Sequence, residues 1–143
     1  SNRLDPEESI VAGARYLDQL RDQMPDSVRE PDRTWLALAA YNIGPGHFNP
    51  ARALARQLDA DSNTWFDMKR VLPLLAQPRY YRKLKSGPAR GGEAVIMTEN
   101  VRSFYDILRR HEPLHRPLKA EATTPAKTKA KANKAKGPVR KKP

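Results

Sequence analysis

The segment that most constrains the fold is residues 35–40, because this helix-length run has almost no polar side. It reads Trp-Leu-Ala-Leu-Ala-Ala, and a helix that is apolar on every side belongs in the middle of a domain. Tyr41 and Asn42 follow, so they are polar groups at the end of a buried helix and need partners or a cleft. Gly44 comes next, where a left-handed cap is expected. The pair either fixes the next loop or lines a binding cleft, and the residues alone favour the first interpretation.

Proline and capping residues predict where the other helices begin and end. Asp5-Pro6 is typical of an N-cap followed by the first helical position, and Pro25 ends that helix. Asn49-Pro50 repeats the pair and predicts a short helix to about residue 58.

Apolar spacing predicts the core-facing side of each helix. Pro73 interrupts an apolar helical segment that starts near residue 65, and a last helix is expected over residues 92–110. No period-2 segment indicates a strand, so the predicted class is all-α. The first helix is expected to bury Ile10, Ala14, Leu17, Leu20 and Met24, and the last helix Ala94, Met97, Val101, Phe104 or Tyr105, and Leu108.

Charge divides the chain into two parts. Residues 119–143 hold nine basic residues against one acidic residue, a net of +8 out of +11. Residues 123–136 contain no large apolar side chain and cannot form a core. We therefore predict one helical domain at residues 1–112 and a disordered Lys/Ala/Pro-rich tail at residues 113–143.

Composition excludes several kinds of site. The chain has no cysteine, so it has no disulfide and no thiolate metal ligand. The histidines His47, His111 and His115 are too scattered to indicate a metal site. No apolar run approaches the ~18 residues of a membrane span.

Four stretches in this order resemble the lytic transglycosylases of the goose-lysozyme-like superfamily. They are Asp-Pro-Glu-Glu-Ser-Ile-Val-Ala-Gly-Ala-Arg-Tyr-Leu at 5–17, Ala-Tyr-Asn-Ile-Gly at 40–44, Gln-Pro-Arg-Tyr-Tyr at 77–81 and Ala-Arg-Gly-Gly-Glu-Ala-Val at 89–95. The resemblance covers about residues 2–112 and implies a partial lysozyme-like helical domain. It also implies cleavage of the β-1,4 bond between N-acetylmuramic acid and N-acetylglucosamine in peptidoglycan, without metal or organic cofactor.

The resemblance also points to a missing residue. In that family the catalytic glutamate lies in a Glu-Ser motif before the helix that here starts at Asp5, and none of the glutamates of this sequence, Glu8 beside Ser9 included, sits in that motif. We therefore expect no catalytic residue in this chain and no activity from it alone. One glutamate is thought to protonate the glycosidic oxygen and then take the proton of the 6-hydroxyl, which closes a 1,6-anhydro ring, so no second carboxylate is required.

The resemblance places Tyr41, Asn42 and Gly44 at the sugar groove. Arg79, Tyr80 and Tyr81 either border the groove as well, where aromatic rings stack on sugars and Arg binds carboxylates, or form a solvated turn. The Gly91-Gly92 pair is either an anion-binding helix start or, more simply, a turn.

Two positions of the last helix bear on the groove. Glu93 occupies the first turn, where the helix dipole favours a carboxylate, so a structural role is sufficient. Met97 stands where the family usually has a tyrosine, which leaves one groove contact open unless Tyr105 or Tyr81 replaces it.

These observations lead to two functional hypotheses. The first is part of a periplasmic lytic transglycosylase acting on peptidoglycan strands, associated with the outer membrane through upstream segments. The alternative is a non-catalytic module that binds peptidoglycan or, through the tail, a polyanion. The tail suits an anionic wall or membrane surface, whereas nucleic acid is disfavoured because aromatic residues and Arg-Gly repeats do not accompany its lysines.

Overall fold

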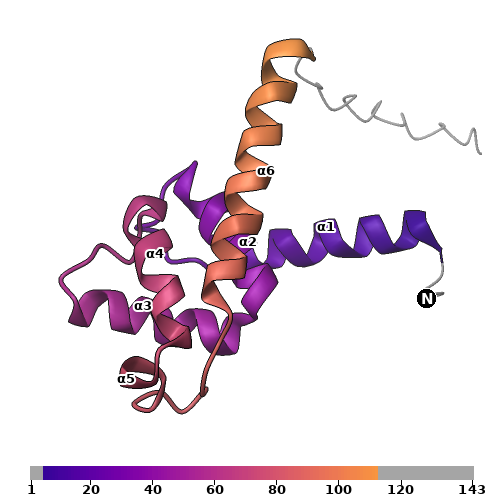
Figure 1. The fold of residues 1–143 in the computed structure, drawn as a ribbon. Coiled ribbons are helices and arrows are strands. Elements are labelled where there is room, and N and C mark those ends of the chain that lie inside the picture. Colours follow the sequence, from indigo (N-terminus) through magenta and orange to yellow (C-terminus); the bar gives the residue numbers. More distant parts are fainter. Residues whose placement is uncertain (1–4, 113–143) are drawn as a thin grey trace, which may run out of the picture. The chain divides into compact units, whose positions relative to one another are not determined.

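The computed structural model describes residues 5–112, and every regular element in this range is helical (Figure 1). The elements are α1 (Pro6–Asp22), α2 (Asp32–Ile43), α3 (Pro45–Gln57), α4 (Trp65–Val71), the 3₁₀ helix η1 (Leu72–Ala76), α5 (Pro78–Tyr81) and α6 (Gly91–His111). The predicted all-α class is therefore confirmed for this part of the chain. The tail predicted at 113–143 lies outside the described residues.

Helix α2 is the centre of the fold and packs against α1, α3, α4 and α6. Trp35, Leu36, Ala37, Ala39 and Ala40 are all buried, as the apolar run predicts. Small alanine side chains let the neighbouring helices approach α2 closely. The core extends from α2 to Phe48 of α3, to Trp65 and Met68 of α4, and to Leu72 and Leu75 of η1.

Two predicted helix ends agree with the structure. The Asp5 side chain accepts hydrogen bonds from the backbone N–H groups of Glu7 (2.9 Å) and Glu8 (3.3 Å), which caps α1. At Leu72, directly before Pro73, the α-helical hydrogen-bond pattern gives way to the tighter 3₁₀ pattern of η1.

Gly44 ends α2 and at once begins α3, which differs from the predicted turn and later helix start. Its φ of 81° and ψ of 148° lie outside the left-handed helical region and are open almost only to glycine. The Gly44 carbonyl accepts bonds from the N–H groups of His47 and Phe48, and Pro45 occupies the first helical position. The predicted start at Asn49-Pro50 is therefore wrong, because Pro50 lies inside α3.

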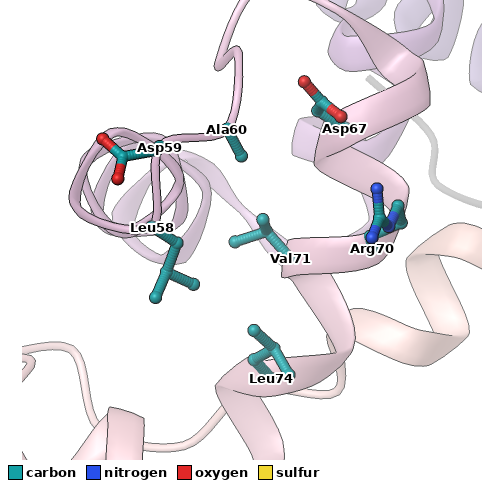
Figure 2. Close-up of a pocket in the computed structure, with 7 residues that line it drawn as sticks. All are labelled: Leu58, Asp59, Ala60, Asp67, Arg70, Val71 and Leu74. Carbon is teal, nitrogen blue, oxygen red and sulfur yellow. The ribbon is translucent and has the colours of Figure 1, made fainter.

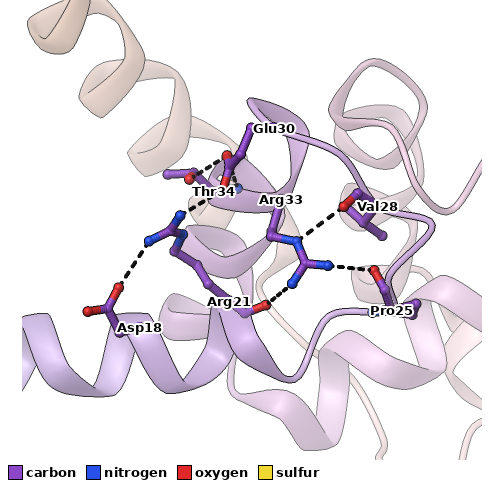
Figure 3. Close-up of polar contacts among 7 residues, drawn as sticks. All are labelled: Asp18, Arg21, Pro25, Val28, Glu30, Arg33 and Thr34. Carbon is purple, nitrogen blue, oxygen red and sulfur yellow. Dashed lines mark hydrogen bonds and ion pairs between the residues drawn. The ribbon is translucent and has the colours of Figure 1, made fainter.

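The α1–α2 connection is fixed by two arginines (Figure 3). Arg33 donates to three backbone carbonyls, those of Val28 (3.1 Å), Arg21 (2.8 Å) and Pro25 (2.9 Å). The Arg21 side chain pairs with Asp18 and with Glu30, at 3.0 and 2.8 Å. These bonds hold the end of α1 and the connecting segment against the start of α2.

Helix α6 is held against η1 and α4 at its N-terminal half. Gly91 is buried so closely that an added Cβ would lie 2.0 Å from the Leu72 carbonyl oxygen. Two turns later, Glu99 accepts a 2.6 Å hydrogen bond from the buried indole N–H of Trp65. Glu99 also pairs with Arg102 at 2.8 Å and Lys69 at 3.6 Å.

The outer halves of α1 and α6 are more exposed than predicted. Leu20 and Met24 are buried and Leu17 is half-buried, but Ile10 is 72% exposed and Ala14 is also exposed. In α6, Ala94 is buried and Met97 half-buried, whereas Val101, Phe104, Tyr105 and Leu108 are all exposed. The prediction of burial is wrong there, because no other described element covers these apolar faces (Figure 1).

Candidate functional site

A groove lies along the open face of α2, with α1 and α6 forming its two walls. Thr34, Leu38 and Tyr41 follow one another on this face of α2 at helical spacing. The apolar part of the groove, about 470 Å³, is lined by Leu17 of α1, by Glu30, Pro31, Thr34, Trp35 and Leu38, and by Val101 and Tyr105 of α6. On α6, Met97, Val101 and Tyr105 are spaced four residues apart and so share one side of the helix. The Tyr41–Asn42 pair stands at one end of this surface.

Tyr41 is held against α1 and remains 43% exposed. Its ring centroid lies 5.5 Å from that of Tyr16 in a tilted arrangement. Gly13 faces its hydroxyl, and a Cβ at that position would lie 3.2 Å from the oxygen. Because Gly13 has no Cβ, α1 leaves room for the Tyr41 hydroxyl at this position.

Asn42 reaches across to α6, where its side-chain amide donates to the Met97 sulfur at 3.5 Å. Thioether sulfur is a weak acceptor. Because the Asn42 side-chain nitrogen is the donor, the bond orients the amide group and leaves its carbonyl oxygen unused. Met97 itself is half-buried. The position where the family resemblance implies a tyrosine therefore still contacts the candidate site, through sulfur.

Aromatic groups line the other end of the groove. Tyr105 lies edge-on to Trp35 with centroids 5.9 Å apart, and the Arg102 guanidinium lies 5.5 Å from the Trp35 ring centroid. Of the two tyrosines considered as replacements at Met97, Tyr105 lines this groove. Tyr81 ends α5 instead, which shares its main contacts with η1.

The carboxylates close to this groove are held in their charged form. Burial alone would raise the pKa of Glu30, but hydrogen bonds from Arg21 and Thr34 outweigh it and lower that pKa. Burial opposes the shift at Glu99 as well, and the Trp65 indole and Arg102 lower its pKa. A general acid in glycoside cleavage needs a raised pKa, so neither residue is suited to that role. Glu93 lies in the first turn of α6, where it pairs with Arg90 at 3.3 Å.

The other predicted site residues lie elsewhere in the fold. Arg79 and Tyr80 line a pocket with Leu54, Gln57 and Leu58 at the α3–α5 side, and this pocket shares no lining residue with the groove. Tyr80 and Tyr81 are both half-buried. The structure thus brings Tyr41 and Asn42 together with α1 and α6, and separates Arg79, Tyr80 and Tyr81 from them.

Sequence reasoning overlooked Tyr16 as a groove residue, although its spacing of three from Gly13 places both on the α1 face that meets Tyr41. His47 lies in α3 and His111 ends α6, while His115 is not among the described residues. Over residues 5–112 no group of three or more His, Asp or Glu side chains could hold a metal ion. None of the helices in this range has the length and apolarity to cross a bilayer.

Sequence comparison gives this groove its context. Residues 1–64 match the family described as the transglycosylase SLT domain. The chain is 52% identical to a membrane-bound lytic murein transglycosylase F of Methylobacillus flagellatus over 82% of its length, and 50% identical to one of Nitrosospira multiformis over 79%. The protein of that name from Ectopseudomonas mendocina is 55% identical over 76% of the chain. The chain spans about a quarter of the length of these relatives, 25%, 24% and 22% respectively. The chain is therefore similar to SLT-domain lytic transglycosylases over most of its length.

Proposed function

We propose that this chain forms part of a peptidoglycan lytic transglycosylase and supplies the wall of its glycan groove. The reaction is cleavage of the β-1,4 bond between N-acetylmuramic acid and N-acetylglucosamine, with formation of a 1,6-anhydro ring. The observation that carries the proposal is the groove along α2, in a chain similar to SLT-domain lytic transglycosylases, with Tyr41 and Asn42 at its end. The proposed location is the periplasm, in keeping with relatives named as membrane-bound.

The groove residues have complementary tasks in this scheme. The Asn42 amide is steadied by Met97, so its carbonyl oxygen can accept from an N-acetyl N–H or a sugar hydroxyl. The Tyr41 hydroxyl, with its ring fixed by Tyr16, can donate to a substituent or to the acid itself. The exposed Tyr105 ring, held edge-on against the buried Trp35, offers a surface on which an apolar sugar face can stack.

The proton-transfer group is proposed to come from residues outside these 143. Glu30 and Glu99 are held charged by their partners, and Glu93 is paired with Arg90 in a helix first turn. The chain alone should therefore bind glycan strands without cutting them. In the whole protein, one glutamate would protonate the leaving oxygen and then accept the 6-hydroxyl proton.

The test is release of 1,6-anhydro-muropeptides from purified sacculi, measured by mass spectrometry. The intact gene product should release them, and the 143-residue chain should not. Release by the chain alone would contradict the assignment of the acid to another part of the protein. Sacculus binding without release by the intact protein would favour the non-catalytic alternative.

A further inference from the structure

The pocket between α3 and α5 has the features of a second binding site, apart from the α2 groove. It has a volume of about 380 Å³, and it is lined by Leu54, Gln57 and Leu58 on one side and by Arg79, Tyr80, Lys83 and Leu84 on the other. Its apolar floor is only a few side chains wide. A ligand that fills it would therefore be small or would present one short segment.

The α5 side of this pocket is positively charged and lacks internal neutralisation. Residues 78–90 contain five basic residues and no acidic residue. Within the part of the chain that the structure describes, Arg79 and Lys83 form no ion pair. Arg79 donates to the Tyr80 hydroxyl at 2.8 Å and its guanidinium lies 4.8 Å from the Tyr80 ring centroid. The guanidinium is thus held at the pocket with donors left over for an anionic ligand.

An adjoining pocket carries the opposite charge. Leu58 lines both pockets, and the second one, shown in Figure 2, also contains Asp59, Asp67 and Arg70. The Asp67 carboxylate accepts from the Asp61 N–H at 2.8 Å, whereas the Asp59 carboxylate has no hydrogen-bond or ion-pair partner among residues 5–112. Figure 2 shows the Leu58, Val71 and Leu74 side chains pointing into the space between the end of α3 and the α4–η1 segment.

The charge arrangement selects among anionic ligands. A phosphate polymer or an anionic membrane surface would meet Asp59 and Asp67 beside the basic pocket and be repelled. A peptide that carries a carboxylate and, a short apolar distance away, an ammonium group would meet a matching charge on each side of Leu58.

We propose that the α3–α5 pocket binds the carboxylate of a zwitterionic peptide through Arg79 and Lys83, with Asp59 facing its ammonium group. On a glycan strand in the α2 groove, such a peptide is the stem peptide of peptidoglycan, and that identification rests on the function proposed above. The site gives the protein a contact with the peptide side of its substrate, away from the bond to be cut. In this proposal Tyr41 and Asn42 contact the glycan strand, whereas Arg79, held by Tyr80, contacts the peptide.

The experiment is calorimetric titration of the intact gene product with a synthetic stem tripeptide ending in diaminopimelate. Replacing both Arg79 and Lys83 with alanine should weaken binding about tenfold or more, because two charge-assisted contacts are lost. The matched control is Arg82→Ala with Lys85→Ala, which removes the same charge from the same segment but from residues that do not line the pocket. That control should change the affinity less than about twofold, in keeping with the small effect of exposed charges. Equal losses in the two double variants, or no peptide binding by the unaltered protein, would overturn the proposal.

A second variant tests the ammonium side. Asp59 has a φ of 55°, and asparagine is among the few side chains that tolerate this backbone conformation, so Asp59→Asn removes the charge without new strain. It should weaken tripeptide binding without weakening the binding of inorganic phosphate. Tighter binding of phosphatidylglycerol vesicles than of the tripeptide would instead identify a lipid site and refute the proposal. Because the tripeptide contains no glycosidic bond, its binding stands or fails independently of whether the protein cleaves sacculi.

Discussion

The packing of Gly91 against η1 makes a prediction that one added methyl group can test. An ideal Cβ on Gly91 would lie 2.0 Å from the Leu72 carbonyl oxygen and 2.5 Å from its carbonyl carbon, both of which are backbone atoms. Ordinary contact begins at 3.4 Å, so 3.4 minus 2.0 leaves 1.4 Å of separation missing. Since backbone cannot rotate away as a side chain can, the start of α6 and η1 would have to move apart.

The size of the effect follows from this clash. Overpacking a core costs about 1–3 kcal/mol, and a clash between two backbones belongs at the upper end, so Gly91→Ala should lower the free energy of unfolding by about 3 kcal/mol. For a domain of this size, that loss corresponds to a drop in Tm of about 12 °C or more. Gly92 is the matched control, because nothing lies within 4 Å of its added Cβ. Gly92→Ala should stabilise the protein by about 0.5–1 kcal/mol through the higher helix propensity of alanine.

Thermal and urea unfolding of the two variants, followed by circular dichroism, decide the matter. The prediction requires that the free energy of unfolding falls for Gly91→Ala and rises for Gly92→Ala. If both variants lie within about 0.5 kcal/mol of the unaltered protein, the close approach of α6 to η1 is not present in solution.

The remaining predictions concern single side chains. Arg33→Ala should cost about 2 kcal/mol in urea unfolding, because three hydrogen bonds to the α1–α2 connection are lost at about 0.5–1.5 kcal/mol each, while the exposed Arg29→Ala should be nearly neutral. Glu99→Gln should destabilise by about 0.5–1 kcal/mol at pH 7, a figure discounted because the side chain is 40% exposed. Because the folded-state pKa of Glu99 is lowered from 4.5, its contribution is complete above that value and is lost as pH falls through the lowered folded-state pKa; a difference between Gln and Glu that does not shrink as the pH is lowered below 4.5 would contradict this assignment. Tyr41→Phe and Asn42→Ala in the intact gene product should each reduce 1,6-anhydro-muropeptide release about 100-fold with Tm nearly unchanged, and unfolding of either variant would support a purely structural pair.

Sequence reasoning succeeded where a local rule decides the structure. The burial of residues 35–40 other than the half-buried Leu38 followed from a run without polar residues, and the start of α1 followed from the Asp5 carboxylate and Pro6. The change of helix type directly before Pro73 followed from a residue that cannot donate a backbone hydrogen bond. Each of these features depends on residues within one or two helical turns.

Local sequence patterns did not predict contacts between residues that are far apart in the chain. The Asn42–Met97 contact joins positions 55 residues apart, and the Trp65–Glu99 bond joins positions 34 apart. Gly91-Gly92 was read as a turn or an anion site, because a glycine that permits a close backbone approach has the same local sequence as one in a turn. The pattern of Arg79, Tyr80 and Tyr81 likewise did not show that the first two face α3 rather than the α2 groove.

The exposed faces of α1 and α6 show the limit of periodicity most clearly. Ile10, Val101, Phe104 and Leu108 stand at helical spacing on their helices, which predicted burial, and yet each is exposed. Spacing identifies which side of a helix is apolar, whereas burial also requires a second surface, and residues 5–112 provide none at these positions. Removing apolar area from water is favourable by about 25 cal/mol per Å². These two faces are therefore where a neighbouring apolar surface would stabilise the described domain most. Both lie on the helices that form the walls of the groove, so a surface that covers them would also border that groove.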